Sequence, residues 1–278
     1  MDMHARAAVF DLYGDHLFRR DYWAPIASTV RLLDSVDVRP EAVRTSVSRL
    51  VREGWLEPVE RHGMRGYVAS ARARRRLDEA RDRIYRAKTP TWQGSWDVLV
   101  FPERITDRSR RARLTDSLGF LGYARLAADT WIAPRRSAEL AEAVAGLTVR
   151  SFTATYEDDG RELAAALWDL EGLAHSYREF IAWAHRLAAE PAGLSDRAAY
   201  AVRTELVHEW RKFLFRDPGL PDVVLPAAWP GRDAATCFDQ LSNELLPRSR
   251  AFVDECLADP HAARPSIEAN SSHPQGVS

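Results

Sequence analysis

The most specific chemistry in this chain is expected on one side of a predicted helix that starts at Pro40 and ends near Trp55. Its apolar residues recur at helical spacing and predict a buried face made of Val43, Val47, Leu50 and Val51. The opposite face gathers arginines and short hydroxyl side chains, namely Arg44, Thr45, Ser48, Arg49 and Arg52. Arginine can bind both acceptors of a guanine or a phosphate, and the hydroxyls can reach base edges or the backbone. The pattern therefore predicts a helix that enters the DNA major groove; the alternative is an ordinary solvated helix face.

The segments around this helix favour the DNA-binding alternative. Two further amphipathic helices are predicted at 5–13 and 25–33, and two short strands at 56–60 and 66–69. Three helices followed by a β-hairpin predict a winged helix-turn-helix, whose last helix enters the major groove while its hairpin lies along the backbone or the minor groove. We expect three side chains of the hairpin loop to contact phosphates: Arg61, His62 and Arg65.

The charge distribution agrees with that expectation. Residues 1–90 carry 18 Lys and Arg against 13 Asp and Glu, whereas the whole chain carries 39 against 40. The basic excess therefore lies in the predicted DNA-binding part, as a phosphate-binding surface requires.

The rest of the chain predicts two more domains. Strands are expected at 96–101, 120–126, 130–133 and 148–156, with helices at 104–118 and 137–145. This β-α-β-β-α-β order is typical of a ferredoxin-like fold. Long apolar stripes from residue 161 onward indicate a helical region. We expect an α+β protein with a winged-helix domain and connecting helix at 1–90, a ferredoxin-like middle domain at 91–158, a helical effector and dimer domain at 159–260, and a disordered tail at 261–278.

Composition and motifs narrow the function classes. The chain has 278 residues and lacks an apolar run near the ~18–20 residues of a membrane span. Residues 1–4 lack the pattern of a signal peptide, so we expect a cytoplasmic protein without membrane contact. The two cysteines, Cys237 and Cys256, form no metal-ligand pair and are expected to be buried thiols.

Motifs of catalysis are missing from the sequence. It contains no phosphate-binding glycine-rich loop, nucleophile elbow or paired-histidine zinc helix. We therefore expect no enzyme, no catalytic residues, no metal site and no cofactor. One alternative stays open, a metal-dependent nuclease that would use the middle domain. Asp97 is the acidic residue in question, and we expect it to be an outward-facing strand residue.

Four stretches of the chain together resemble the PaaX-like family of bacterial transcriptional repressors. They are Asp11-Leu12-Tyr13-Gly14-Asp15; residues 42–56 around the predicted recognition helix; Trp168-Asp169-Leu170-Glu171-Gly172-Leu173 with Tyr177 and Phe180; and Leu206-Val207-His208-Glu209-Trp210-Arg211-Lys212-Phe213 with Asp217-Pro218 and residues 225–231. The likeness covers about residues 5–257. The recognition-helix stretch is common to many winged helices, whereas the Trp-Asp-Leu and His-Glu-Trp-Arg stretches together are specific. Trp210 stands where the family has a tyrosine.

The resemblance implies a function and a set of partners. Members of the family are dimeric repressors of aromatic or related catabolic operons, and the founding type releases DNA when it binds phenylacetyl-coenzyme A. We therefore expect a homodimer that binds a double-stranded operator and is released by an aryl- or acyl-coenzyme A thioester; a non-thioester ligand is the alternative. The expected effector-binding residues are Trp168, Tyr177, His208, Trp210, Arg211 and Lys212.

Overall fold

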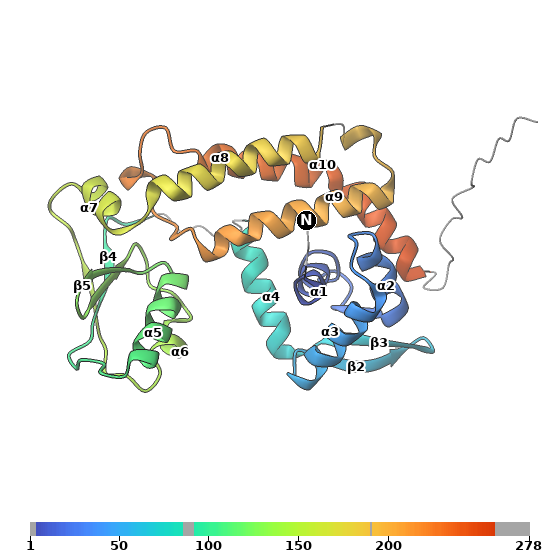
Figure 1. Cartoon of the computed structure of the whole chain (residues 1–278), viewed down its shortest axis with the longest axis horizontal. Coiled ribbons are helices and arrows are strands. Elements are labelled where there is room, and N and C mark those ends of the chain that lie inside the picture. The colour runs from blue at the N-terminus through green and yellow to red at the C-terminus, as the bar shows by residue number, and fades with distance from the viewer. Residues whose placement is uncertain (1–3, 86–91, 190, 259–278) are drawn as a thin grey trace, which may run out of the picture.

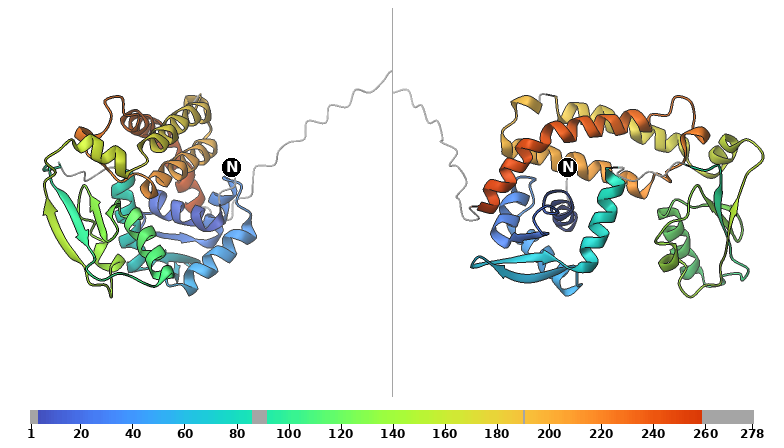
Figure 2. Two further views of the ribbon diagram at one scale, coloured as in Figure 1. Left: turned by 60° about the vertical axis from the view of Figure 1, so that its left-hand side comes forward. Right: turned by 180° about the vertical axis from the view of Figure 1, so that it is seen from behind.

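The structure is a computed structural model that describes residues 4–85, 92–189 and 191–258. Three long helices, α8, α9 and α10, form a bar along one side of the molecule (Figure 1). The N-terminal module lies beneath one end of the bar and the middle domain beneath the other, and helix α4 lines the side of the module that faces the middle domain (Figures 1 and 2). The predicted disordered tail at 261–278 lies outside the described residues.

The N-terminal module consists of short helices and a three-stranded sheet. Its elements are α1 (Ala5–Asp11), the π-helical turn η1 (Leu12–His16), β1 (Trp23–Pro25), α2 (Ile26–Asp34), α3 (Pro40–Arg52), β2 (Leu56–Arg61), β3 (Met64–Ala69) and α4 (Ala71–Ile84). The antiparallel sheet has the order β1-β3-β2. Three helices thus precede the β2–β3 hairpin, in the order that a winged helix-turn-helix would have.

The hairpin turn has only two residues, fewer than the five-residue loop that we predicted. Strand β2 ends at Arg61 and β3 begins at Met64, so His62 and Gly63 make the connection. Both have positive φ, 52° and 69°, which a two-residue turn of type I′ requires at its central positions. Glycine tolerates this conformation, whereas His62 adopts it at a steric cost.

Helix α4 follows the hairpin without a loop. The side chain of Ser70 caps it by accepting a hydrogen bond from the backbone of Ala73. Arg74 Nε donates to the Ala69 carbonyl at 2.9 Å, and the Arg72 guanidinium lies 4.7 Å from the centre of the Trp55 ring. These contacts fix the direction of α4 relative to the hairpin.

The middle domain has the topology that its sequence predicts. Its elements are β4 (Trp96–Val100), α5 (Arg108–Phe120), β5 (Ala124–Ala127), β6 (Thr130–Ala133), α6 (Leu140–Ala143) and β7 (Arg150–Ala154). The four strands are antiparallel in the order β5-β6-β4-β7, the arrangement of a split β-α-β sandwich. Helices α5 and α6 pack on one face of this sheet and α7 (Gly160–Leu167) on the other.

The prediction that Asp97 points outward is wrong. Its residue is only 7% exposed, because the Tyr123 hydroxyl donates a hydrogen bond to Oδ2 of Asp97 inside the domain. Burial and this hydrogen bond raise the pKa of Tyr123, so the phenol stays protonated and can donate. Among the residues that the structure describes, no cluster of three or more His, Cys, Asp or Glu is placed to hold a metal ion.

The C-terminal region is almost entirely helical. It contains α8 (Leu170–Leu187), η2 (Pro191–Gly193), α9 (Asp196–Trp210), η3 (Arg211–Phe215), η4 (Asp222–Val224) and α10 (Gly231–Ala258). Helix α10 bends along its length (Figure 2) and contains Pro247, which cannot donate a helical hydrogen bond. Both cysteines are buried and unpaired in this region, as predicted.

The N-terminal module and the C-terminal helices share one hydrophobic core. Tyr200 of α9 and Phe252, Val253 and Cys256 of α10 pack into the cluster that holds the inward residues of α1, α2 and α3. Because this burial is continuous, the module and the helical bar form one packed body. The middle domain instead has a core of its own between its sheet and α5.

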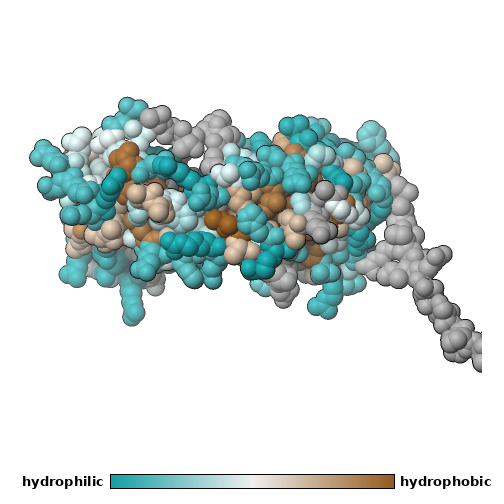
Figure 3. All heavy atoms as spheres, turned by 90° about the horizontal axis from the view of Figure 1, so that it is seen from above, coloured by the Kyte–Doolittle hydropathy of each residue, from teal (hydrophilic) through white to brown (hydrophobic). Residues whose placement is uncertain are grey.

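The surface is mixed in character. Viewed over the C-terminal helices, hydrophilic side chains surround hydrophobic ones that gather near the middle of the molecule (Figure 3). None of the helices within the described residues combines the length and the hydropathy needed to cross a bilayer.

Candidate nucleic-acid interface and ligand region

Helix α3 presents two chemically different faces. Val43, Val47 and Leu50 are at most 1% exposed and pack against the helices before them, while Val51 is half-buried. The five predicted DNA-contacting residues lie on the other side of the helix, turned toward solvent: Arg44, Thr45, Ser48, Arg49 and Arg52. Pro40 occupies the first turn of the helix, and Gly54, with a positive φ of 72°, follows the last turn. The helix therefore has the start and the end that its sequence predicts.

The side chains of this exposed face are free to take a ligand. Within the described parts of the chain, none of the five forms an ion pair or a side-chain hydrogen bond. Three guanidinium groups and two hydroxyls are therefore presented to solvent along one helix. This arrangement suits the acceptors of a nucleic-acid groove and its phosphates.

The three predicted hairpin residues differ in whether their side chains already have partners within the protein. His62 and Arg65 are exposed at and beside the turn. Arg61 instead lies over the Trp23 ring, 5.5 Å from its centre, with Nη1 3.6 Å from Oδ2 of Asp21. Since the Asp21 side chain is 82% exposed, this ion pair is weak and Arg61 can exchange it for a phosphate.

The structure adds basic residues that we did not predict for this surface. Arg72 and Arg75 are exposed in the first turns of α4, directly after the hairpin, and Arg72 stacks on Trp55 just beyond α3. The run of arginines at 72–76 was the available signal. Its residues have different environments, however, because Arg74 binds a backbone carbonyl and Arg76 binds the middle domain.

The six residues predicted to bind an effector do not converge on one point. Tyr177 and Trp210 lie together in an aromatic cluster, in which the Tyr177 ring stacks on Phe213 at 4.3 Å between centres and the Trp210 ring stacks on Phe238 at 4.9 Å. The Tyr177 hydroxyl donates to Asp217 at 2.6 Å. Both residues line a cavity of about 620 Å³ between the helical bar and the middle domain.

The wall of this cavity contains residues that the sequence did not single out. Arg135 and Arg136 come from the middle domain, Arg83 from α4, and Trp229 and Arg232 from the segment at the start of α10. A cavity with aromatic rings on one wall and several guanidinium groups on others has the chemistry to bind a flat apolar group that carries anions. No local sequence signal marks these residues as a group, because separate segments supply them.

The other four predicted effector residues serve structural contacts. His208 Nδ1 lies 2.7 Å from Oδ2 of Asp11, and Arg211 Nε lies 2.9 Å from Oδ1 of the same carboxylate. Lys212 Nζ lies 2.5 Å from Glu209 Oε1. Trp168 is half-buried and stacks on Trp96, 6.0 Å away, at the outer face of the middle sheet.

A second buried ion pair lies beside Asp11. Arg203 Nη1 binds Asp15 Oδ2, and both side chains are less than a tenth exposed. The Tyr85 hydroxyl donates to Oδ1 of Asp15 and accepts a hydrogen bond from Arg203 Nη2. Successive turns of α1 and η1 are therefore tied to successive turns of α9 by charged groups.

Comparisons with known proteins agree with this architecture. Three family models match in order: PaaX-like protein at residues 4–73, PaaX protein central Cas2-like domain at 89–164, and PaaX-like protein C-terminal domain at 168–255. The chain is 29% identical over 265 residues to Transcriptional repressor PaaX of Escherichia coli (strain K12), covering 89% of this chain and 82% of that protein. The solved structure of the uncharacterized protein Rv0674 from Mycobacterium tuberculosis matches with a TM-score of 0.60 and 25% identity, covering 90% of this chain and 99% of that one.

These findings define the class of protein as a transcriptional repressor of mixed helix and sheet. The three matching models follow one another over most of the chain, and the E. coli relative aligns over most of its length as well. The chain belongs to the PaaX-like family, as the four sequence stretches predicted.

Proposed function

We propose that this protein is a homodimeric, cytoplasmic repressor that binds an operator through its N-terminal module, used as a winged helix-turn-helix. In this proposal residues 1–90 bind DNA, 91–158 form the middle domain, and 159–260 serve effector binding and dimer formation. The observation that carries the proposal is the exposed polar face of α3. Among the described residues its hydroxyl and guanidinium groups have no partner, and buried valines and a leucine anchor the opposite face of the helix. The hairpin adds His62 and Arg65 beside it.

The proposal requires two copies on DNA. One recognition helix reads only a few base pairs, so useful selectivity needs two half-sites related by two-fold symmetry. We expect an operator that is an inverted repeat, with its half-sites separated by about one helical repeat or a multiple of it.

We propose further that an aryl- or acyl-coenzyme A thioester releases the DNA. The support is the cavity of about 620 Å³, where Tyr177, Trp210 and Trp229 can contact an aryl or acyl group while Arg135 and Arg136 offer charge for phosphates. Release requires that the ligand bind the DNA-incompetent form more tightly, and a hundredfold preference supplies about 2.7 kcal/mol. A catabolic operon would be the regulated unit.

Protection of the promoter upstream of the protein's own coding region tests the DNA-binding proposal. A footprint over an inverted repeat, with both strands intact after addition of Mg²⁺, is the expected result. Cleavage that depends on Mg²⁺ would instead support a nuclease, and absence of protection at micromolar protein would contradict operator binding. Light scattering in the same buffer is expected to give the mass of a dimer.

A panel of aryl- and acyl-coenzyme A thioesters with their free acids tests the effector. A thioester that binds by calorimetry and releases the footprint is expected, and release by the free acids alone would point to a non-thioester ligand. If no compound binds below roughly millimolar concentration, the effector proposal fails while the operator proposal stands.

A further inference from the structure

The middle domain meets the rest of the molecule at a joint with two different sides. On the outer face of its sheet, Trp96 and Ile132 share a hydrophobic cluster with Leu220 and Val224 of the C-terminal region. On the opposite face, where α5 and α6 lie, the joint includes a partly exposed ion pair with α4. The Phe120 ring of α5 lies on this second side too, 5.3 Å from that of Phe215, which is 57% exposed. The buried hydrophobic side is suited to a lasting attachment, and the exposed, largely polar side to a contact that opens and closes.

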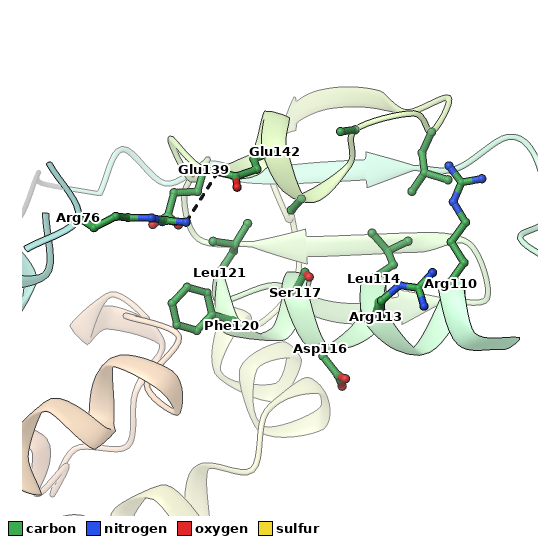
Figure 4. A pocket seen from close by; sticks show the side chains of 13 residues that line it. Arg76, Arg110, Arg113, Leu114, Asp116, Ser117, Phe120, Leu121, Glu139 and Glu142 are labelled. Atoms are coloured by element: carbon green, nitrogen blue, oxygen red, sulfur yellow. Dashed lines mark hydrogen bonds and ion pairs between the residues drawn. The ribbon is translucent and has the colours of Figure 1, made fainter. Parts of the chain in front are cut away.

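The main polar contact is an ion pair between α4 and the residues around α6. The guanidinium of Arg76 binds Glu139 Oε2 through Nη1, and its Nη2 lies 3.7 Å from Oε2 of Glu142 (Figure 4). The side chains of Arg76, Glu139 and Glu142 are 39%, 26% and 77% exposed, so water screens the attraction. The Arg76 guanidinium therefore bridges two carboxylates, and because water screens the attraction, this contact can open at a small cost in free energy.

Three cavities at the joint all touch this ion pair. Glu139 lines the cavity of about 620 Å³ described above, a second of about 690 Å³ between α5 and α6 (Figure 4), and a third of about 350 Å³ against α1 and η3. Arg76 lines the second and the third. A molecule that enters any of these cavities meets a partner of the ion pair.

Helix α4 connects the ion pair to the proposed DNA-binding surface. Arg76 lies in the same helix as Arg72 and Arg74, which fasten the start of α4 to Trp55 and to the end of β3. A change in the position of the middle domain relative to Arg76 is therefore a change relative to α3 and the hairpin. Release of Arg76 from the middle domain therefore acts on the helix that positions α3 and the hairpin.

We infer that Arg76, Glu139 and Glu142 form a latch that holds the middle domain against α4, and that the closed latch is the state that binds the operator. This inference rests on the proposed function for its effect on DNA, but the latch itself is a property of the joint. Opening it lets the middle domain swing about its hydrophobic attachment and releases Arg76, so α4 no longer holds the hairpin and α3 in one fixed placement and operator affinity falls.

Neutralising Glu139 and Glu142 distinguishes loss of the latch from a general effect of charge on DNA binding. Glu139→Gln with Glu142→Gln opens the latch while it makes the protein more positive, so electrostatics alone predicts equal or tighter operator binding. The latch predicts binding that is weaker by about three- to fivefold, because a partly exposed ion pair contributes at most about 1 kcal/mol. Arg186→Gln is the matched control for Arg76→Gln, because Arg186 is an exposed arginine of α8 that lies outside the proposed DNA-binding surface and forms no contact with the middle domain among the described residues. Operator affinity of the carboxylate variant equal to or higher than that of the wild type would overturn the inference.

A distance measurement tests the latch without DNA. Spin labels at the exposed positions Ala112 of α5 and Ala251 of α10, in a full chain with both buried cysteines replaced by alanine, report the separation of the middle domain from the helical bar. We expect one narrow distance distribution with the latch intact and a broadened or shifted one in Arg76→Glu, restored when Glu139→Arg is added. An unchanged distance distribution in a folded Arg76→Glu variant would overturn the latch. Because this measurement contains no DNA, its result does not depend on whether the protein binds the operator.

Discussion

The carboxylate of Asp11 and the imidazole of His208 join the first helix of the chain to α9, with 2.7 Å between Oδ2 and Nδ1. Arg211 binds the other oxygen of the same carboxylate, whose side chain is only 4% exposed. Both partners were predicted as effector residues on the strength of a family resemblance. In the structure they satisfy a buried acid at the boundary between the N-terminal module and the helical bar.

Removal of the Arg211 guanidinium is therefore expected to destabilise the protein. Arg211→Met leaves the buried Asp11 carboxylate with one partner fewer, and we expect the free energy of unfolding to fall by about 1–3 kcal/mol. Lys212→Met is the matched control, because Lys212 is 48% exposed and its pair with Glu209 contributes little. Urea unfolding of both variants measures the difference. Equal stability of the two variants would show that the Asp11 contact carries no net stabilisation.

Acid is expected to destabilise the fold through His16. Burial, aided by the nearby charge of Arg20, lowers the pKa of this imidazole from 6.5 to about 3. Between these values the unfolded chain binds a proton that the folded chain does not, so stability decreases as pH falls from 6.5 toward 3, by at most about 1.4 kcal/mol per pH unit from this residue. Urea unfolding of a His16→Gln variant should show a shallower decline in the free energy of unfolding between pH 7 and pH 5. The control is His175→Gln, at an exposed position, which should keep the slope of the wild type. A His16→Gln slope as steep as that of the wild type would assign the acid sensitivity to other groups.

The hairpin is expected to supply DNA affinity that does not depend on the DNA sequence. Arg65→Ala removes one exposed guanidinium, and each phosphate that is no longer bound should flatten the slope of log K against log salt by about 0.9. Fluorescence anisotropy from low to moderate salt on operator and on shuffled duplex measures both slopes. Arg232→Ala, a charge change at the start of α10, serves as the control. If Arg65→Ala and Arg232→Ala gave the same slope as the wild type, the hairpin would lie outside the interface.

Local periodicity explains why α3 and the middle-domain topology could be predicted. Val43, Val47 and Leu50 repeat at the spacing of one helix face, and burying that face leaves the opposite residues exposed whatever the rest of the chain does. Strand and helix patterns at 96–156 likewise predicted the order of elements, although α6 is shorter than expected, at Leu140–Ala143.

Long-range packing explains what could not be predicted. Asp97 looked like an outward strand residue because its partner, the Tyr123 hydroxyl, comes from a segment 26 residues away. Asp15, in the π-helical turn at Leu12–His16, pairs with Arg203, which lies far along the chain in α9. The cavity beside Tyr177 takes its arginines from separate domains, so its composition depends on how those domains dock.

Operator binding by variants of the α3 face tests the central claim most directly. Arg44→Ala and Arg49→Ala each remove an exposed guanidinium from a helix whose buried face is untouched, so circular dichroism should show a folded protein. Binding is measured by anisotropy on the footprinted site and on single-base variants of it. Removal of an Arg–guanine pair is expected to weaken binding by about 1–3 kcal/mol and to relax discrimination at one base pair. Operator affinity, base preference and salt dependence that all stay at wild-type values in both variants would contradict recognition through α3.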